Sequence, residues 1–206
     1  MIPADFLTMG EPPDFVRQDP ARRLLAIKVV ADHATRAHKG QFRRDRQTPF
    51  ISHPAKVAAL TGMFGGSHIA IMSAWLHDVY EDCTPEWIMK TDSLLFSLSL
   101  IPDEKVEMGA ILDALTKKNT IRGKGARLSD SIDRILNAPP EATLVKLCDR
   151  IDNLLDSAGR NGRFTRRYLA STDEIIEKLS TRAALYGYGT ALDLLVTIRN
   201  SELKME

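Results

Sequence analysis

The pair His77-Asp78 and the two carboxylates that follow it, Glu81 and Asp82, have the residue types and spacing of a reaction site. If this segment is one helix, residues four apart share a face, and the acidic pair stacks over the His-Asp pair. Carboxylates this close repel one another unless a cation neutralises them, and unpaired ionisable groups are costly to bury in an apolar helix. A bound metal ion accounts for all four side chains.

His53 and Asp149 extend this group to two imidazoles and two carboxylates. His53 comes directly before a proline that we expect to open a helix. Asp149 lies in the helical segment TLVKLCDRIDNLLD, on the same side as Asn153, which is four residues later. Nitrogen and oxygen ligands without sulfur suit Mn, Fe, Co or Zn, and they leave positions open for water and a phosphate oxygen. We therefore predict a metal site formed by His53, His77, Asp78 and Asp149.

Each of these elements has an ordinary explanation when it is taken alone. A single buried histidine is more often a hydrogen-bonded core residue than a ligand. The string from Asp149 to Asp152 is typical of a solvated, ion-paired helix face. The combination of His-Pro, HDxxED and K-x-x-D-R-x-x-N in one chain favours the metal site.

Three groups of basic residues provide candidates for phosphate binding, because Arg contacts phosphate oxygens with two parallel hydrogen bonds. The first group comes just before His53, which favours a role in substrate binding for Arg43 and Arg44. The other two groups are better explained as solubilising charges. The groups are Lys39, Arg43, Arg44 and Arg46; Lys117, Lys118, Arg122, Lys124 and Arg127; and Arg160, Arg163, Arg166 and Arg167.

The composition excludes several classes of protein. The 206 residues contain 28 Lys and Arg against 27 Asp and Glu, a net charge of +1 that argues against a protein that coats nucleic acid. No apolar run is long enough to span a membrane, and the N-terminus lacks the pattern of a secretory signal. Cys83 and Cys148 form no zinc-binding pattern. We expect a cytoplasmic protein with a small-molecule substrate and neither a nucleic-acid nor a membrane partner.

Apolar residues recur with the helical period, and regular alternation is scarce, so the sequence predicts an all-α bundle of about eight to ten helices. We expect an N-terminal arm over 1–18 and a single domain over 19–206. Predicted helices cover about 19–38, 54–66, 69–82, 103–116, 127–138, 141–157, 165–185 and 189–200, with one more beginning at Thr84-Pro85. The apolar stretch 93–101 is either additional core or a subunit contact, which leaves a homo-oligomer open.

The order AHKGQFRR…TPFISHPAKVA, AWLHDVYEDCT, LTKK and LVKLCDRIDNL resembles the HD hydrolase domain of RelA/SpoT proteins. The likeness is strongest to the stand-alone forms, the small alarmone hydrolases and metazoan SpoT homologues. It covers residues 21 to about 185. The HD superfamily in general shares only H…HD…D, so the additional elements GQ-x-R, TPFISHP, the ED after HDxx and DRxxN narrow the resemblance to this family.

The resemblance implies an HD-domain bundle that hydrolyses the 3′-pyrophosphate of guanosine tetra- or pentaphosphate to GDP or GTP plus pyrophosphate, with Mn²⁺. By position, the family's metal ligands match His53, His77, Asp78 and Asp149, and its water-activating acidic pair matches Glu81 and Asp82. Its nucleotide-contacting basic loop contains Arg43 and Arg44. A residue near the ribose matches Asn153, and a substrate-side tyrosine matches Tyr168.

The basic loop departs from the family pattern, because it reads RRDRQTPF and lacks the usual glycine. This loop reads the base, so one alternative is an HD phosphohydrolase that acts on another phosphorylated nucleotide, such as NADPH or an adenosine alarmone. A second alternative is a non-catalytic nucleotide-binding module, against which the intact Glu81 and Asp82 argue. No nucleotidyl-synthetase domain follows in these residues, so the expectation is hydrolysis and not synthesis.

Overall fold

The computed structural model describes residues 19–118, 120–156 and 162–202, except for the side chains of 162–165 and 202. Over these residues the chain is an all-α bundle, as predicted. The helices are α2 (Pro20–Ala37), α3 (Ser52–Met63), α4 (His68–Leu76), α5 (Val79–Asp82), α6 (Pro85–Ser97), α7 (Pro102–Leu115), α8 (Lys124–Asn137), α9 (Glu141–Leu155), α10 (Gly162–Leu185) and α11 (Gly189–Glu202). The expected arm over 1–18 lies outside the described residues.

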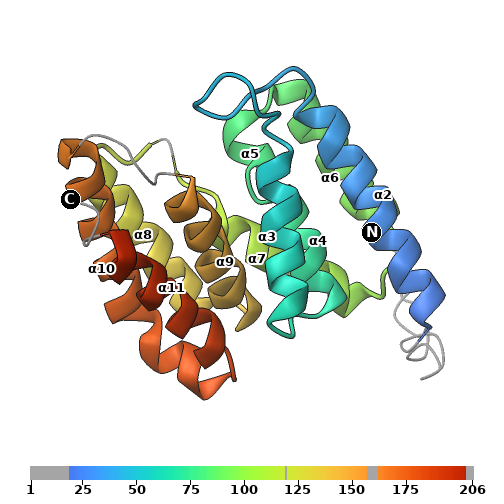
Figure 1. Cartoon of the computed structure of the whole chain (residues 1–206). Helices are drawn as coiled ribbons and strands as arrows, with labels where there is room; N and C mark the ends of the chain where they lie inside the picture. The colour runs from blue at the N-terminus through green and yellow to red at the C-terminus, as the bar shows by residue number, and fades with distance from the viewer. Residues whose placement is uncertain (1–18, 119, 157–161, 203–206) are drawn as a thin grey trace.

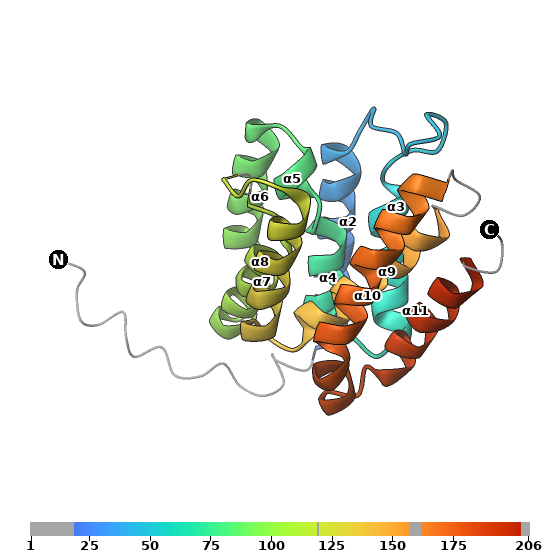
Figure 2. The same ribbon diagram turned by 90° about the vertical axis from the view of Figure 1, so that its left-hand side faces the viewer.

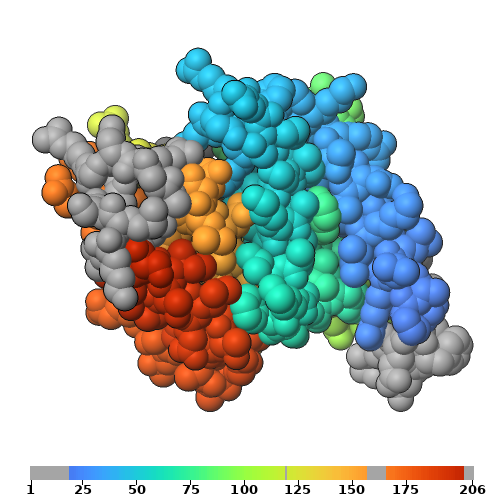
Figure 3. Space-filling view, in the orientation of Figure 1, coloured from blue at the N-terminus to red at the C-terminus, as the bar shows by residue number. Residues whose placement is uncertain are grey.

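Helices α4 and α9 form the centre of the bundle. In α4 the side chains from Ile69 to Leu76 are buried except those of Ile71 and Trp75. In α9 every side chain from Ala142 to Asp152 is buried, including charged ones. Helix α3 packs against both and runs between α2 and the α9–α11 part of the molecule (Figures 1 and 3).

Local signals set several helix ends where the sequence places them. The side chain of Asp19 accepts a hydrogen bond from the backbone nitrogen of Ala21, and Pro20 follows at the first helical position. Helix α6 likewise begins with Pro85 after Thr84, although the Thr84 hydroxyl makes no capping hydrogen bond.

The structure corrects the prediction at the two segments that carry the histidines. Helix α3 begins at Ser52, so His53 lies in its first turn. The continuous helix expected over 69–82 is wrong, because α4 ends at Leu76 and α5 starts at Val79. At the break, Nδ1 of His77 bonds to the backbone oxygen of Ala74 at 2.7 Å. The side chain thus supplies a hydrogen bond to a backbone oxygen in the last turn of α4.

The apolar stretch 93–101 contributes mainly to the core. Leu98, Leu100 and Ile101 are buried, whereas Phe96 is 85% exposed near the end of α6. The aliphatic residues of this stretch therefore take the first predicted role, additional core, whereas Ser93, Phe96, Ser97 and Ser99 are exposed. None of the described helices has the length and apolar character needed to cross a bilayer.

One end of the bundle gathers the segments that carry the candidate residues. Figures 1 and 2 place the loop 38–51, the short helix α5 and the beginning of α10 at this end. The site described next is built there, from residues that are distant in the sequence.

Candidate metal centre and active site

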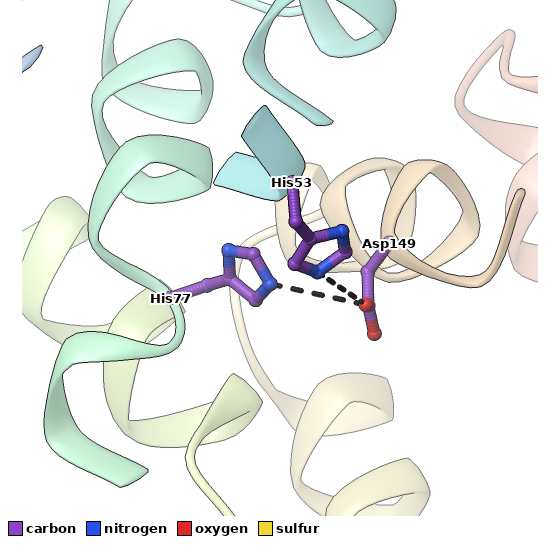
Figure 4. Close-up of side chains that lie close together, drawn as sticks. All are labelled: His53, His77 and Asp149. Atoms are coloured by element: carbon purple, nitrogen blue, oxygen red, sulfur yellow. Dashed lines mark ion pairs between the residues drawn. The ribbon is translucent and has the colours of Figure 1, made fainter. Parts of the chain in front are cut away.

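His53, His77 and Asp149 meet at one point from three helical segments. Figure 4 shows both imidazole rings directed at one carboxylate oxygen of Asp149. The Nε2 atoms of His53 and His77 lie 3.3 and 3.8 Å from Oδ1 of Asp149. All three side chains are buried, and their ligand atoms lie within 4.8 Å of one another. The three could hold a metal ion.

Asp78 completes the predicted set. Its Oδ2 atom lies 3.4 Å from Nε2 of His53 and 3.3 Å from Nε2 of His77. Metal–ligand bonds of about 2.0–2.2 Å place neighbouring ligand atoms roughly 3.0–3.4 Å apart, depending on the coordination geometry. The distances from Asp78 to the two histidines are therefore close to those around a single cation, although Asp78 is not in the group whose ligand atoms all lie within 4.8 Å of one another.

The hydrogen bonds of the two histidines fit a metal at this point. A backbone carbonyl only accepts, so Nδ1 of His77 carries a proton that it donates to Ala74. Its Nε2 atom is buried and has no hydrogen-bond partner among the described residues. Nδ1 of His53 likewise bonds to Oδ2 of Asp152 at 2.7 Å. In the neutral form both Nε2 atoms offer a lone pair to the cluster, as metal ligation requires.

The electrostatics of the cluster favour positive charge. Burial alone lowers the pKa of His53, but Asp149, Asp152 and Asp78 together raise it to about 11. The pKa of Asp149 is pushed up by burial and pulled down further by Lys146 and the histidines, so the carboxylate stays ionised. A divalent cation would replace the histidine protons as the counter-charge for these carboxylates.

Lys146 is a residue of this centre that sequence reasoning included in the motif K-x-x-D-R-x-x-N but gave no role. Its Nζ atom lies 2.9 Å from Oδ2 of Asp149, the oxygen that does not face the histidines. Burial lowers the pKa of this lysine although Asp149 acts against the shift. The signal was available, because lysine three residues before the ligand aspartate lies on the same helix face.

Asp152 is the second residue to which the sequence reading gave no role. A solvated face was the ordinary explanation for this string, yet Asp152 is 3% exposed. Besides His53, it lies 3.5 Å from Nη2 of Arg43 and 3.4 Å from Nζ of Lys56. Asp152 thus fixes the orientation of His53, a candidate metal ligand, by bonding to the ring nitrogen that faces away from the cluster.

The metal cluster opens into a cavity of about 540 Å³. Its lining includes Arg43 and Arg44 of the first basic group. It also includes Lys117, Lys124 and Arg127 of the second group, for which solubilising charge was the favoured explanation. Of the third group, Arg166 and Arg167 are exposed and do not line the cavity, whereas Arg160 and the side chain of Arg163 lie outside the described part. The cationic lining residues are Arg43, Arg44, Lys117, Lys124, Arg127, Lys146 and Arg150.

Glu81 and Asp82 both line this cavity but have different surroundings. Glu81 accepts hydrogen bonds from the backbone nitrogen of Lys117 at 2.6 Å and from its Nζ at 2.8 Å. Desolvation and the neighbouring carboxylates of Asp78 and Glu81 raise the pKa of Asp82 to about 6. Of the two, Asp82 is better suited to exchange a proton near neutral pH.

The four predicted substrate-binding residues, Arg43, Arg44, Asn153 and Tyr168, all line the cavity. Arg44 is exposed, whereas Arg43 is buried and lies 3.2 Å from Asp156 and 3.3 Å from Asn153. Asn153 also donates to Asp149 through its amide. The phenol ring of Tyr168 lies 4.5 Å from the guanidinium carbon of Arg150. The lining therefore combines cationic groups with aromatic surface.

The loop that lacks the family's glycine keeps a conformation that normally suits glycine. Arg46 has a φ of 61°, in the left-handed region. The turn is held by Asp45, whose carboxylate accepts from the backbone nitrogens of Gln47 and Thr48 and from the Thr48 hydroxyl. These hydrogen bonds lower the pKa of Asp45 to about 2. The loop thus forms this turn without a glycine and presents a cationic side chain at the left-handed position.

The helical bundle and the order His53…His77-Asp78…Asp149 define the HD class of all-α proteins. A family model of the HD domain matches residues 31–185, so the chain belongs to the HD domain family.

Two relatives extend the comparison. The chain is 29% identical over 184 residues to the bifunctional (p)ppGpp synthase/hydrolase SpoT of Escherichia coli K12 and covers 24% of its length. It is 34% identical over 130 residues to the human guanosine-3′,5′-bis(diphosphate) 3′-pyrophosphohydrolase MESH1, a match that includes 62% of this chain and 66% of MESH1. The chain thus spans about a quarter of the length of SpoT, and the resemblance to RelA/SpoT hydrolase domains is confirmed.

A solved structure shares the fold. It is that of a metazoan SpoT orthologue, described as hydrolysing ppGpp and acting in starvation responses. The TM-score is 0.66 at 21% identity, and the match covers 84% of this chain and 95% of the other. The likeness supports the helical arrangement described above.

Proposed function

We propose that this protein hydrolyses the 3′-pyrophosphate of guanosine tetra- or pentaphosphate to GDP or GTP and pyrophosphate, with Mn²⁺ bound by His53, His77, Asp78 and Asp149. The observation that carries the proposal is the pair of inward-facing Nε2 atoms and two carboxylates at the wall of a cationic cavity. SpoT and MESH1 carry this activity in their names.

The surrounding residues suit the chemistry of a charged phosphate ester. A bound divalent metal would lower the pKa of a coordinated water and polarise a phosphoryl oxygen. Asp82, with its raised pKa, accepts the proton of the attacking water. The cationic lining balances the negative charge of the pyrophosphate group as it leaves.

A second candidate substrate is another phosphorylated nucleotide, such as NADPH or an adenosine 3′-pyrophosphate. The observation that favours it is Arg46, whose exposed cationic side chain stands at a left-handed position of the base-reading loop, which lacks the family's glycine. An additional exposed cation at this position changes the surface that the base or a remote phosphate meets.

The test is a substrate screen with EDTA-treated protein to which single divalent metals are added back. We expect Mn²⁺ to restore pyrophosphate release from guanosine tetraphosphate. Full activity of metal-free protein rules out the metal mechanism. Hydrolysis of NADPH or of adenosine 3′-pyrophosphate with equal kcat/KM rules out the guanine-specific version.

The ligand assignment has its own control. Asp149→Ala is expected to lose both bound metal and activity, because the remaining ligands cannot hold an ion in fixed geometry. Asp133→Ala, on the exposed face of α8, is expected to retain both. Metal content measured by elemental analysis separates loss of the ion from loss of the fold, which circular dichroism monitors.

A further inference from the structure

His38 and Gln41 lie beside the cavity without lining it. His38 follows the last residue of α2 and is 2% exposed, with its ring 4.9 Å from that of Phe50. Its Nδ1 atom lies 2.7 Å from Oε1 of Gln41. The proposed reaction has so far given neither residue a role.

The side chain of Gln41 reaches the acidic pair. Its Nε2 atom donates to the backbone oxygen of Asp82 at 2.8 Å. A carbonyl can only accept, so this bond sets which end of the amide is nitrogen. The other end, Oε1, must then accept from His38, and Nδ1 of His38 carries the proton. A directed chain of hydrogen bonds runs from His38 through Gln41 to Asp82.

One end of this chain is rigid and the other is weakly held. The backbone nitrogen of Gln41 donates to the oxygen of His38 at 3.0 Å, and its oxygen accepts from Phe50 at 2.9 Å. By contrast, Asp82 ends the four-residue helix α5, and the next residue, Cys83, is extended. A single helical turn is not stable by itself. Asp82 therefore depends on contacts from outside its own helix.

The protonation state of His38 suits a hydrogen-bond donor to Gln41. Burial lowers its pKa, so the ring is neutral and has one N–H to give. That proton goes to Gln41, and Nε2 remains buried without a partner among the described residues. An unpartnered buried nitrogen is costly, which an apolar residue at the same position would avoid. The hydrogen bond that Nδ1 donates to Gln41 offsets this cost, and an apolar residue could not make it.

We propose that His38 and Gln41 are positioning residues that hold Asp82 at the metal centre, so that turnover, and not substrate affinity, depends on them. The inference rests on the proposed role of Asp82 in hydrolysis. Neither side chain lines the cavity, so their effect on the reaction passes through the backbone oxygen of Asp82.

The first test removes the link at Gln41. Gln41→Met keeps the length of the side chain but can neither donate to Asp82 nor accept from His38. We expect kcat to fall roughly 10- to 100-fold, the usual effect of losing an outer partner of a reaction centre, with KM and metal content unchanged. Gln47→Met is the matched control, because Gln47 is exposed in the same loop and does not line the cavity.

The second test separates the hydrogen bond from the bulk of the ring. His38→Asn places an amide nitrogen near the position of Nδ1 and is expected to keep most of the activity. His38→Leu is expected to behave like Gln41→Met. An unchanged kcat in folded, metal-loaded Gln41→Met would overturn the proposal, as would a change confined to KM.

A third readout needs no substrate. The ¹⁵N resonances of the His38 imidazole should report the Nδ1–H tautomer in the wild type loaded with diamagnetic Zn²⁺, because Mn²⁺ would broaden them, and the loss of this tautomer in Gln41→Met. An Nε2–H tautomer of His38 in the wild type would contradict the directed chain of hydrogen bonds from His38 to Asp82. If the wild type releases pyrophosphate from no nucleotide, the proposed function fails, while the tautomer still decides whether the hydrogen-bond chain exists.

Discussion

The Nδ1 atom of His53 lies 2.7 Å from Oδ2 of Asp152, which is buried on the same helix as Asp149. Helix α9 therefore supplies both a proposed metal ligand and the group that orients another one. Because the two aspartates are three residues apart, the helix holds their relative positions. This relationship fixes the direction in which His53 presents Nε2 to the cluster.

Removing Asp152 should weaken metal binding without removing a ligand. We expect Asp152→Ala to raise the Kd for Mn²⁺ roughly 10- to 100-fold, the range for outer-sphere partners of metal-bound histidines. Asp152→Asn should lose less, because its amide oxygen still accepts from Nδ1 of His53. Calorimetric titration of EDTA-treated protein measures both. An identical Kd in wild type and Asp152→Ala would show that the contact does not orient the ligand.

The acidic pair should divide its roles. Asp82→Asn is expected to bind metal normally and to lose roughly 10²–10⁴ in kcat, the usual contribution of a general acid–base group. Glu81→Gln should lose less, since its amide oxygen still accepts from the backbone nitrogen of Lys117. Steady-state rates at saturating Mn²⁺ test the difference. Normal turnover in both variants would make the pair merely structural.

The pH profile provides an independent measurement of Asp82. Its pKa is raised to about 6, so the basic form is present above that pH and is lost as the pH falls through it. We expect kcat/KM to decline with one proton below about pH 6 in the wild type. Asp82→Asn should abolish this limb of its residual profile. An acid limb that persists in the variant assigns the titration to another group.

Arg43 and Arg44 should affect substrate binding, with an additional effect for Arg43. A charge-assisted contact contributes about 1.5–3 kcal/mol, so each alanine variant is expected to raise KM on the order of ten- to a hundredfold. Arg43→Ala should also lower the melting temperature, because Arg43 pairs with the carboxylates of Asp152 and Asp156. Arg44 is exposed, and its replacement should leave the melting temperature unchanged. Thermal unfolding and initial rates separate the two effects.

Arg46→Gly should stabilise the fold. Holding a residue with a Cβ atom at positive φ costs about 1–2 kcal/mol of folding free energy. Glycine avoids this strain, but it loses more conformational entropy on folding, which offsets part of the gain. We expect a gain of about 1 kcal/mol in the free energy of unfolding, or roughly 2–4 °C in melting temperature. Arg46→Ala, which keeps the strain, is the control. If Arg46→Gly also changes the preference among guanosine, adenosine and NADPH substrates, the arginine takes part in reading the nucleotide.

Short stretches of sequence determined where several helices begin and which residue types could bind a metal. Asp19-Pro20 and Thr84-Pro85 mark the starts of α2 and α6, because capping and the fixed φ of proline depend on adjacent residues alone. The spacing in HDxxED and the order of the H…HD…D residues identified the candidate metal ligands for the same reason. The motifs His-Pro, HDxxED and K-x-x-D-R-x-x-N are each complete within a few residues, although their order extends from His53 to Asn153.

The tertiary structure decided which side chains surround those ligands. The bond of Gln41 to Asp82 and that of Glu81 to Lys117 join residues 41 and 36 positions apart. The burial of Asp152 depends likewise on α9 lying against α3. None of these contacts leaves a periodic signal in the sequence, since each is set by how two helices or loops pack and not by the residues next to them. Packing therefore converted three charged residues with ordinary surface patterns, Lys117, Lys146 and Asp152, into parts of one site.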